Sequence, residues 1–187
     1  MFNFTIMVNI NSYKILYDGI FLLKNFNVED ISLFYKVKNI VHWDNTIKSR
    51  KTASFGKPYN YSNINYEIKE IPTFIDEIIN KIEKIVDFRP NNCLINYYYN
   101  ENSKMGFHSD QIDILEEGTG IIIISLGSSR IITFKHKLEN KSFDIVLDSN
   151  SLLYMTQEIQ KKWLHAILPS NNLEDERISL TFRRIKD

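Results

Sequence analysis

Two of the chain's four histidines, His108 and His165, are candidate ligands of a metal site. Asp110 follows His108 by two residues, so both side chains would point to the same side of an extended segment. His165 lies far downstream, in a segment that we expect to be a strand. Two imidazoles and one carboxylate leave three coordination positions open, which suits Fe(II) and oxygen chemistry, and zinc accepts the same ligands. On these residues alone, two hydrogen-bonded histidines without a metal are the structural alternative.

A strand-like segment, residues 177–183, carries an arginine at each end. Apolar side chains alternate along it with Arg177, Ser179, Thr181 and Arg183. Two arginines on one face of a core strand need anionic partners. At ~3.3 Å per residue their Cα atoms would lie ~20 Å apart, which suits an approach to a small dianion and its metal from opposite ends. A structural salt bridge is the alternative for Arg183.

Two earlier segments have the apolar spacing of helices. The first runs from about residue 28 to 37, with Asn27 as its N-cap. It would carry Ile31, Phe34 and Tyr35 on one side. The second begins at Thr73 as N-cap, with Asp76 in the capping-box position. Its core stripe would be Ile75, Ile78, Ile79, Ile82, Ile85 and Val86.

From Cys93 onward, short segments rich in Ile, Tyr and Phe alternate with turns of Gly, Asn, Asp and Ser, which predicts strands. The expected strands are residues 93–99, 120–126, 129–135, 142–147, 151–155, 164–168 and 177–184. Residues 127–129 read as a tight hairpin turn. Many short strands after a helical start predict an α+β fold, an antiparallel sandwich or barrel with helices packed outside.

Length and composition narrow the class of protein. The 187 residues predict one domain, and 43% hydrophobic content is enough for a core. The single cysteine excludes a disulfide framework and a multi-cysteine zinc site. Without a membrane-length apolar run or a signal peptide, we expect an intracellular protein, cytoplasmic or nuclear, that does not contact membranes and is a monomer.

The net charge of zero means that any nucleic-acid partner must be held by a local patch. Residues 36–57 are the candidate, because they contain six basic residues and only one acidic residue, Asp44. Two solvated faces of opposite charge, the second over residues 67–88, are the alternative explanation of this distribution.

Several motifs occur in an order that resembles the AlkB family of Fe(II)- and 2-oxoglutarate-dependent dioxygenases. They are residues 96–98 (NYY), 106–110 (GFHSD), 124–127 (ISLG), 151–155 (SLLYM), 163–165 (WLH) and 177–183 (RISLTFR). Residues 49–51 (SRK), 55–56 (FG) and 59–62 (YNYS) are similar to the family's substrate-recognition segment. The resemblance covers about residues 17–185.

The resemblance implies a double-stranded β-helix, or jelly roll, over residues 93–187, with helices and the recognition segment in residues 1–92. It implies iron bound by His108, Asp110 and His165. Arg177 would bind the distal carboxylate of 2-oxoglutarate, and Arg183 would brace Asp110. Asn96, Tyr98 and Ser179 would complete the co-substrate site.

On the substrate side, the resemblance implies that Tyr61 stacks on a base opposite the ring of His108, with Tyr59 and Ser62 nearby. Arg50 and Lys51, with Ser49, would approach the phosphate backbone. The implied reaction is oxidative removal of N-linked methyl or alkyl groups from bases of DNA or RNA. It would use Fe(II), 2-oxoglutarate and O₂ and release formaldehyde, succinate and CO₂.

Two positions depart from the family pattern. Ser179 stands where members often have Asn, and Ile112 stands where many repair members have an acidic residue, with Asp113 one position further on. Two other functions stay open: a hydroxylase that acts on a protein or small molecule, and an inactive binding module that keeps the fold.

Overall fold

Two antiparallel sheets form the centre of the protein in a computed structural model, which describes residues 13–17, 19–26, 29–59, 66–171 and 176–187. The larger sheet has seven strands in the order β1-β2-β9-β6-β11-β4-β3. They are β1 Tyr13–Tyr17, β2 Ile20–Leu23, β3 Lys51–Gly56, β4 Asn92–Tyr98, β6 Gly120–Gly127, β9 Ser151–Thr156 and β11 Arg177–Arg183. The smaller sheet has the order β5-β10-β7-β8. Its strands are β5 Met105–His108, β7 Arg130–His136, β8 Ser142–Leu147 and β10 Trp163–Ile167.

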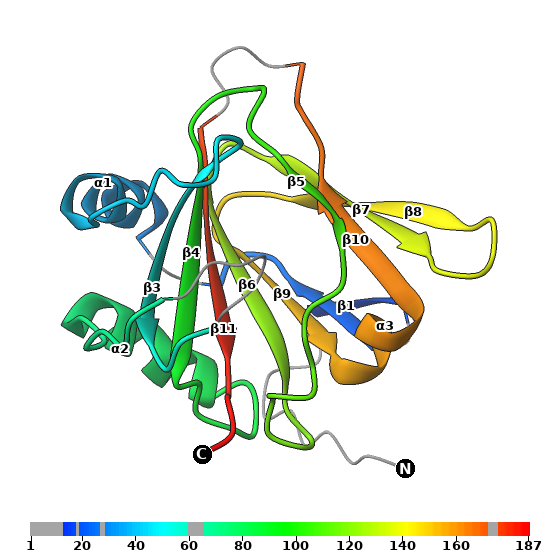
Figure 1. Cartoon of the computed structure of the whole chain (residues 1–187), viewed down its shortest axis with the longest axis horizontal. Helices are drawn as coiled ribbons and strands as arrows, with labels where there is room; N and C mark the ends of the chain where they lie inside the picture. The colour runs from blue at the N-terminus through cyan, green and yellow to red at the C-terminus, as the bar shows by residue number, and fades with distance from the viewer. Residues whose placement is uncertain (1–12, 18, 27–28, 60–65, 172–175) are drawn as a thin grey trace.

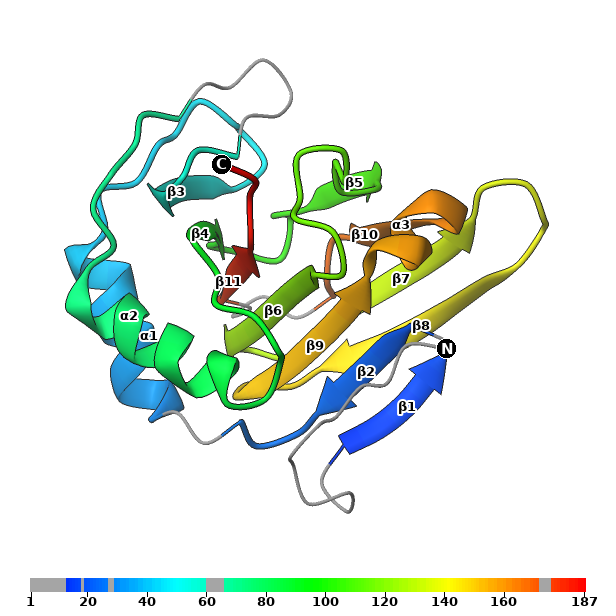
Figure 2. The same cartoon turned by 90° about the horizontal axis from the view of Figure 1, so that it is seen from below.

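The two sheets face each other, and helices α1 (Asp30–Ile40) and α2 (Thr73–Glu83) cover the outer face of the larger sheet (Figures 1 and 2). A short helix, α3 (Gln157–Lys162), connects β9 to β10 and so carries the chain from one sheet to the other. No helix in the described part of the chain is both long and apolar enough to cross a membrane.

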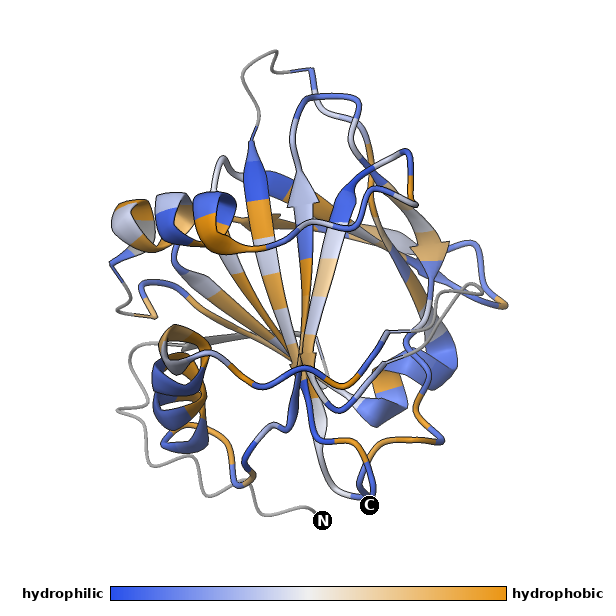
Figure 3. Cartoon of the chain, turned by 60° about the vertical axis from the view of Figure 1, so that its left-hand side comes forward, coloured by the Kyte–Doolittle hydropathy of each residue, from blue (hydrophilic) through white to orange (hydrophobic). Residues whose placement is uncertain are grey.

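Successive side chains along the strands of the larger sheet point to opposite faces, so the sheet has a separate apolar cluster on each face. Ile95 and Leu180 point to the helices, whereas Leu94 and Ile123 point to the smaller sheet. The apolar stripe of α2 lies on the side toward the sheet, as Figure 3 shows. Burial of both faces explains why β6 is a nearly continuous apolar run, whereas the cavity face of β11 consists of the polar side chains Arg177, Ser179, Thr181 and Arg183.

Both helix starts differ from their predictions. Thr73 is the first residue of α2 and Pro72 precedes it as the cap, without a side-chain capping bond. Glu29 precedes α1 in the same way, and the predicted cap Asn27 lies outside the described residues. On α1 the buried positions are Phe34 and Val37, whereas Ile31 and Tyr35, which were expected on the same side as Phe34, are 72% and 56% exposed.

All seven predicted strands are present within one or two residues of their expected bounds. The first half of the chain contributes more than helices, however, because β1, β2 and β3 join the larger sheet at its two edges. Neither these strands nor β5 and α3 were predicted from the sequence.

Candidate active site

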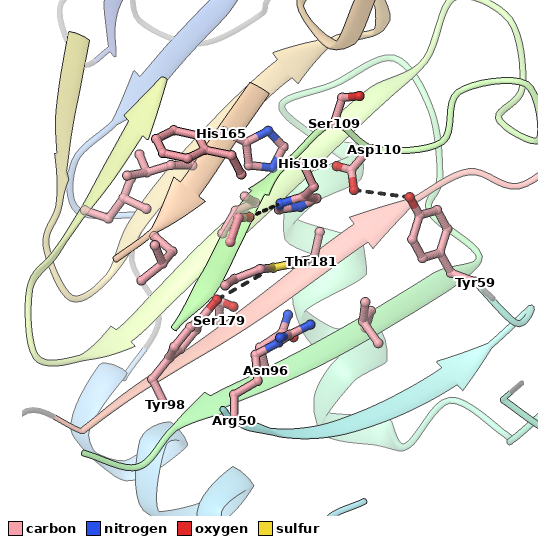
Figure 4. A pocket seen from close by; sticks show the side chains of 18 of the residues that line it. Arg50, Tyr59, Asn96, Tyr98, His108, Ser109, Asp110, His165, Ser179 and Thr181 are labelled. Carbon is pink, nitrogen blue, oxygen red and sulfur yellow. Dashed lines mark hydrogen bonds between the residues drawn. The ribbon is translucent and has the colours of Figure 1, made fainter. Parts of the chain in front are cut away.

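The two histidines of the predicted metal site are direct partners in the smaller sheet. His108, the last residue of β5, pairs with His165 of β10, and their ring centroids are 4.2 Å apart. Asp110 follows in the loop after β5, so it is not on the strand that the two-residue spacing suggested. Ligand atoms of His108, Asp110 and His165 all lie within 4.8 Å of one another, and Figure 4 shows the three side chains together.

The two imidazoles have different surroundings. His108 is half-buried, and its Nδ1 lies 2.9 Å from the carbonyl of Gly106, which leaves Nε2 for a metal when Nδ1 is the donor. His165 is buried, and burial, with the nearby His108, lowers its pKa to about 3. Its side chain is therefore a neutral imidazole, the form that binds metals.

Asp110 is held by three neighbours. Arg183 Nη2 donates to its Oδ1 at 2.8 Å and the Tyr59 hydroxyl donates to the same oxygen at 3.2 Å, while the Asp110 N–H donates to Gln160 Oε1 at 2.9 Å. Burial alone would raise the pKa of Asp110, but the nearby charge of Arg183 lowers it to about 2. The carboxylate is therefore ionised.

These three residues fit an Fe(II) ion. They provide one ionised carboxylate and two imidazoles, which is the donor set of non-haem iron oxygenases. The buried Nδ1 of His165 has no hydrogen-bond partner among the described residues, so His165 is not a satisfied core histidine. Two hydrogen-bonded histidines without a metal, the alternative that the sequence left open, explain this geometry less well.

A cavity of about 320 Å³ extends from these residues between the two sheets. Arg177 lines it and is only 1% exposed. Its Nη2 donates to Ser125 Oγ at 2.9 Å, and its guanidinium lies 5.3 Å from the centre of the Tyr98 ring. Asn96 and Ser179 line the same cavity, so the structure brings together every residue expected at the co-substrate site. A buried guanidinium in such a cavity can bind a carboxylate.

The two basic residues expected at a phosphate backbone lie on opposite faces of the larger sheet. Arg50 is buried and donates from Nε to Asn96 Oδ1 at 2.8 Å, inside the cavity (Figure 4). Lys51 Nζ lies on the helix side, 5.6 Å from the centre of the Tyr99 ring. Arg50 is therefore not placed to meet a phosphate on the surface.

Tyr59 also differs from its expected position beside a base. It is buried, its hydroxyl accepts from the Gln111 N–H at 2.8 Å as well as donating to Asp110, and the Arg183 guanidinium lies 3.8 Å from its ring centre. Tyr61 and Ser62 lie outside the described residues.

Three residues of the site were not predicted from the sequence. Gln160 of α3 holds the Asp110 backbone, Ser125 of β6 binds Arg177, and Gln111 lines the cavity next to Asp110. Sequence motifs could have indicated Ser125, because it lies in the ISLG segment, but its partner depends on the pairing of Ser125 with Ser179 across β6 and β11.

A family model for the 2OG-Fe(II) oxygenase superfamily matches residues 29–183. The alpha-ketoglutarate-dependent dioxygenase alkB homolog 3 of Homo sapiens is 30% identical over 147 residues, which are 73% of this chain and 51% of that protein. The DNA oxidative demethylase ALKBH2 of Bos taurus is 26% identical over 147 residues, 73% of this chain and 53% of that protein. The chain thus spans about half the length of these curated relatives.

Among solved structures, OsALKBH1 superposes with a TM-score of 0.71 at 18% sequence identity, over 92% of this chain and 100% of that chain. At this level of sequence identity, the superposition shows that the two proteins share a fold. The predicted jelly-roll core is thereby confirmed.

Proposed function

Because the chain belongs to the 2OG-Fe(II) oxygenase superfamily, and within it to the AlkB family, we propose that it removes methyl groups from nucleic-acid bases by oxidation. One observation carries this proposal. The cavity that contains the mutually close ligand atoms of His108, Asp110 and His165 also contains the buried guanidinium of Arg177.

His108, Asp110 and His165 would hold the iron. With 2-oxoglutarate and O₂, bound iron supplies the oxidation of a methyl C–H bond to a hydroxymethyl group, which is lost from the base nitrogen as formaldehyde, while the co-substrate becomes succinate and CO₂.

The chain's own residues bind and orient the reactants. Arg177 offers a planar two-point fork to a carboxylate of 2-oxoglutarate, beside the polar side chains of Asn96 and Ser179. Arg183 keeps Asp110 ionised, and the hydrogen bonds from Arg183 and Tyr59 fix the direction of its carboxylate. Apolar walls from both sheets, such as Leu94 and Ile132, limit the access of water to the cavity.

A base must leave its stack to reach this cavity. Phe107 lines the cavity and is 42% exposed, so its ring is available to a base at the entrance. Tyr61, from the recognition segment, is proposed as a second stacking residue. Stacking on an aromatic side chain contributes ~1–3 kcal/mol per base.

Formaldehyde release from a panel of methylated DNA and RNA oligonucleotides, with Fe(II), 2-oxoglutarate and O₂, tests the proposal. We expect release from at least one oligonucleotide and none from its unmethylated counterpart. Succinate formation that no oligonucleotide stimulates would instead indicate a hydroxylase of a protein or small molecule. Absence of succinate under all conditions would indicate the inactive binding module.

A further inference from the structure

We infer that Arg50 acts in 2-oxoglutarate binding as a positioning residue. It fixes the orientation of the Asn96 side-chain amide, so that the NH2 group of the amide, and not its oxygen, faces the co-substrate. Arg50 was expected at a phosphate backbone, but it is buried and lines the cavity. This role of Arg50 rests on the proposed function of Asn96 at the co-substrate site, and it is independent of the substrate that is oxidised.

The pairing of β3 with β4 explains why Arg50 reaches Asn96. Lys51, the first residue of β3, pairs with Tyr97, and Thr52 pairs with Asn96. Arg50 directly precedes Lys51, so its side chain lies on the face of Asn96, whereas the side chain of Lys51 lies on the face of Tyr97. A diagonal neighbour on the adjacent strand is within reach of a long side chain. The two adjacent basic residues therefore have different surroundings.

The hydrogen bond between Arg50 and Asn96 determines which way the amide points. Arg50 Nε donates to Asn96 Oδ1 at 2.8 Å, and Figure 4 shows the two side chains next to each other. A guanidinium has donors and no acceptor, so it can meet the oxygen of an amide and not the nitrogen. Asn96 Nδ2 therefore points away from Arg50 Nε. Asn96 is only 3% exposed, and its Nδ2 makes no hydrogen bond with the residues that the structure describes.

The donor that this orientation leaves over lies in the part of the cavity that is proposed to bind 2-oxoglutarate. Asn96 pairs across β4 and β11 with Ser179, two residues after Arg177, and all three side chains line the cavity. A carboxylate only accepts hydrogen bonds, and a donor that meets it gains a strong, charge-assisted bond. The reversed amide would turn its oxygen toward the co-substrate and repel it. By excluding that orientation, Arg50 raises the affinity for 2-oxoglutarate.

A double-mutant cycle separates positioning from direct binding. The Kd of 2-oxoglutarate would be measured by isothermal titration calorimetry on the full chain, with Mn(II) in place of Fe(II) so that no turnover occurs. We expect Arg50→Met and Asn96→Ala each to raise this Kd about tenfold, the loss typical of one hydrogen bond to a charged group. The double variant should also show a rise of only about tenfold, because Arg50 acts through Asn96.

An additive rise of about a hundredfold in the double variant would show that Arg50 contributes by itself and would overturn the inference. Lys48→Met is a matched control, because Lys48 is an exposed basic residue two positions before Arg50. It should leave the Kd of 2-oxoglutarate unchanged. Mn(II) affinity should be that of the wild type in all variants, which would show that the metal site is intact.

Asn96→Asp tests the orientation without a change at Arg50. It keeps an oxygen for Arg50 Nε and replaces the NH2 group by a second oxygen, so the Kd of 2-oxoglutarate should rise at least as much as in Asn96→Ala. Wild-type affinity in Asn96→Asp would overturn the inference even if Arg50→Met did not fold. An unchanged Kd in Asn96→Ala would remove Asn96 from the co-substrate site, and the role of Arg50 with it. An unchanged Kd in Arg50→Met alone would refute only the role of Arg50.

Discussion

Among the site residues, Tyr59 lies in the position that differs most from the role expected from the sequence. Its buried hydroxyl connects the Asp110 carboxylate to the Gln111 N–H, and its ring lies against Arg183. We expect Tyr59→Phe to weaken metal binding, because partners of metal ligands typically contribute a factor of about 10–100 to metal affinity or activity. Anaerobic Fe(II) titration of the purified variant would measure this loss.

Tyr99→Phe provides a matched control for Tyr59→Phe. It removes the same atom, a phenolic oxygen that donates to the Lys48 carbonyl at 3.0 Å, on the surface and away from the cavity. Metal affinity should be unchanged in this variant. Wild-type metal affinity in Tyr59→Phe would show that Arg183 alone is enough to hold Asp110.

Arg177→Lys should raise the 2-oxoglutarate concentration needed for half-maximal turnover. Lysine keeps the positive charge but loses the planar fork and the hydrogen bond to Ser125. Metal affinity should stay close to that of the wild type, because it is Arg183 that bonds the candidate ligand Asp110. An unaltered 2-oxoglutarate dependence would assign the co-substrate carboxylate to another residue, with Arg50 the next candidate.

Some site residues could be predicted because their chemistry has few alternatives. A histidine–carboxylate spacing and arginines inside an apolar strand need partners wherever they occur, so His108, Asp110 and Arg177 were found. The environments of Arg50 and Tyr59 depend on which face of a strand, or which side of a loop, meets the cavity. That information lies in the pairing of distant strands and not in the local sequence.

At the scale of elements, a cluster of polar contacts fixes α1 to the start of β11. Lys38 Nζ lies 2.8 Å from Glu176 Oε2, and the Tyr97 hydroxyl donates to Glu176 Oε1 at 2.6 Å. Glu176 directly precedes Arg177. The cluster therefore connects a helix on the outside to the strand that carries Arg177, the proposed co-substrate arginine.

Glu176→Gln should lower the free energy of unfolding by about 1 kcal/mol at pH 7, a magnitude typical of a partly exposed charged hydrogen bond. Burial alone would raise the pKa of Glu176, but hydrogen bonds from Lys38 and Tyr97 lower it below 4.5. The stabilisation is therefore present above pH 4.5 and is lost as the pH falls through the lower pKa of the folded state.

Urea unfolding at pH 7 and at pH 3 would measure the effect of Glu176→Gln. The difference from the wild type should be clear at pH 7 and smaller at pH 3. Glu139→Gln, which removes an exposed pair with Lys141, serves as control and should change neither value. A difference that grows toward low pH would contradict the assignment of the cluster.

Strand prediction succeeded where burial on both faces made a long apolar run, as in β6, and where apolar and polar residues alternate strictly, as in β11. It missed β3, whose sequence KTASFG has small and polar residues that are buried only because β4 lies beside it. It missed β5 because four residues with a glycine are too short for a pattern. Such strands are recognised by their partners and not by their own composition.

At the scale of the whole molecule, the proposed metal site connects parts that are far apart in the sequence. Its ligands come from β5, the loop after it and β10 in the smaller sheet, and Arg183 joins them from β11 of the larger sheet. Ligands that bind there should stabilise the entire fold and not a local segment.

Anaerobic Fe(II) with 2-oxoglutarate should therefore raise the melting temperature. A ligand at 100 times its Kd stabilises by about 2.7 kcal/mol, and in a chain of this length each kcal/mol shifts Tm by about 2–4 °C. The expected rise is roughly 5–11 °C by differential scanning calorimetry. His108→Ala, Asp110→Ala and His165→Ala should each lose this rise and should also produce no succinate.

In contrast, Ile79→Ala, a fully buried core change on the helix side, should lower the stability by about 2–5 kcal/mol and keep the ligand-induced rise. A rise that survives in all three ligand variants would place the metal elsewhere, whereas its loss in Ile79→Ala would mean that global destabilisation, and not the missing ligand, abolishes binding.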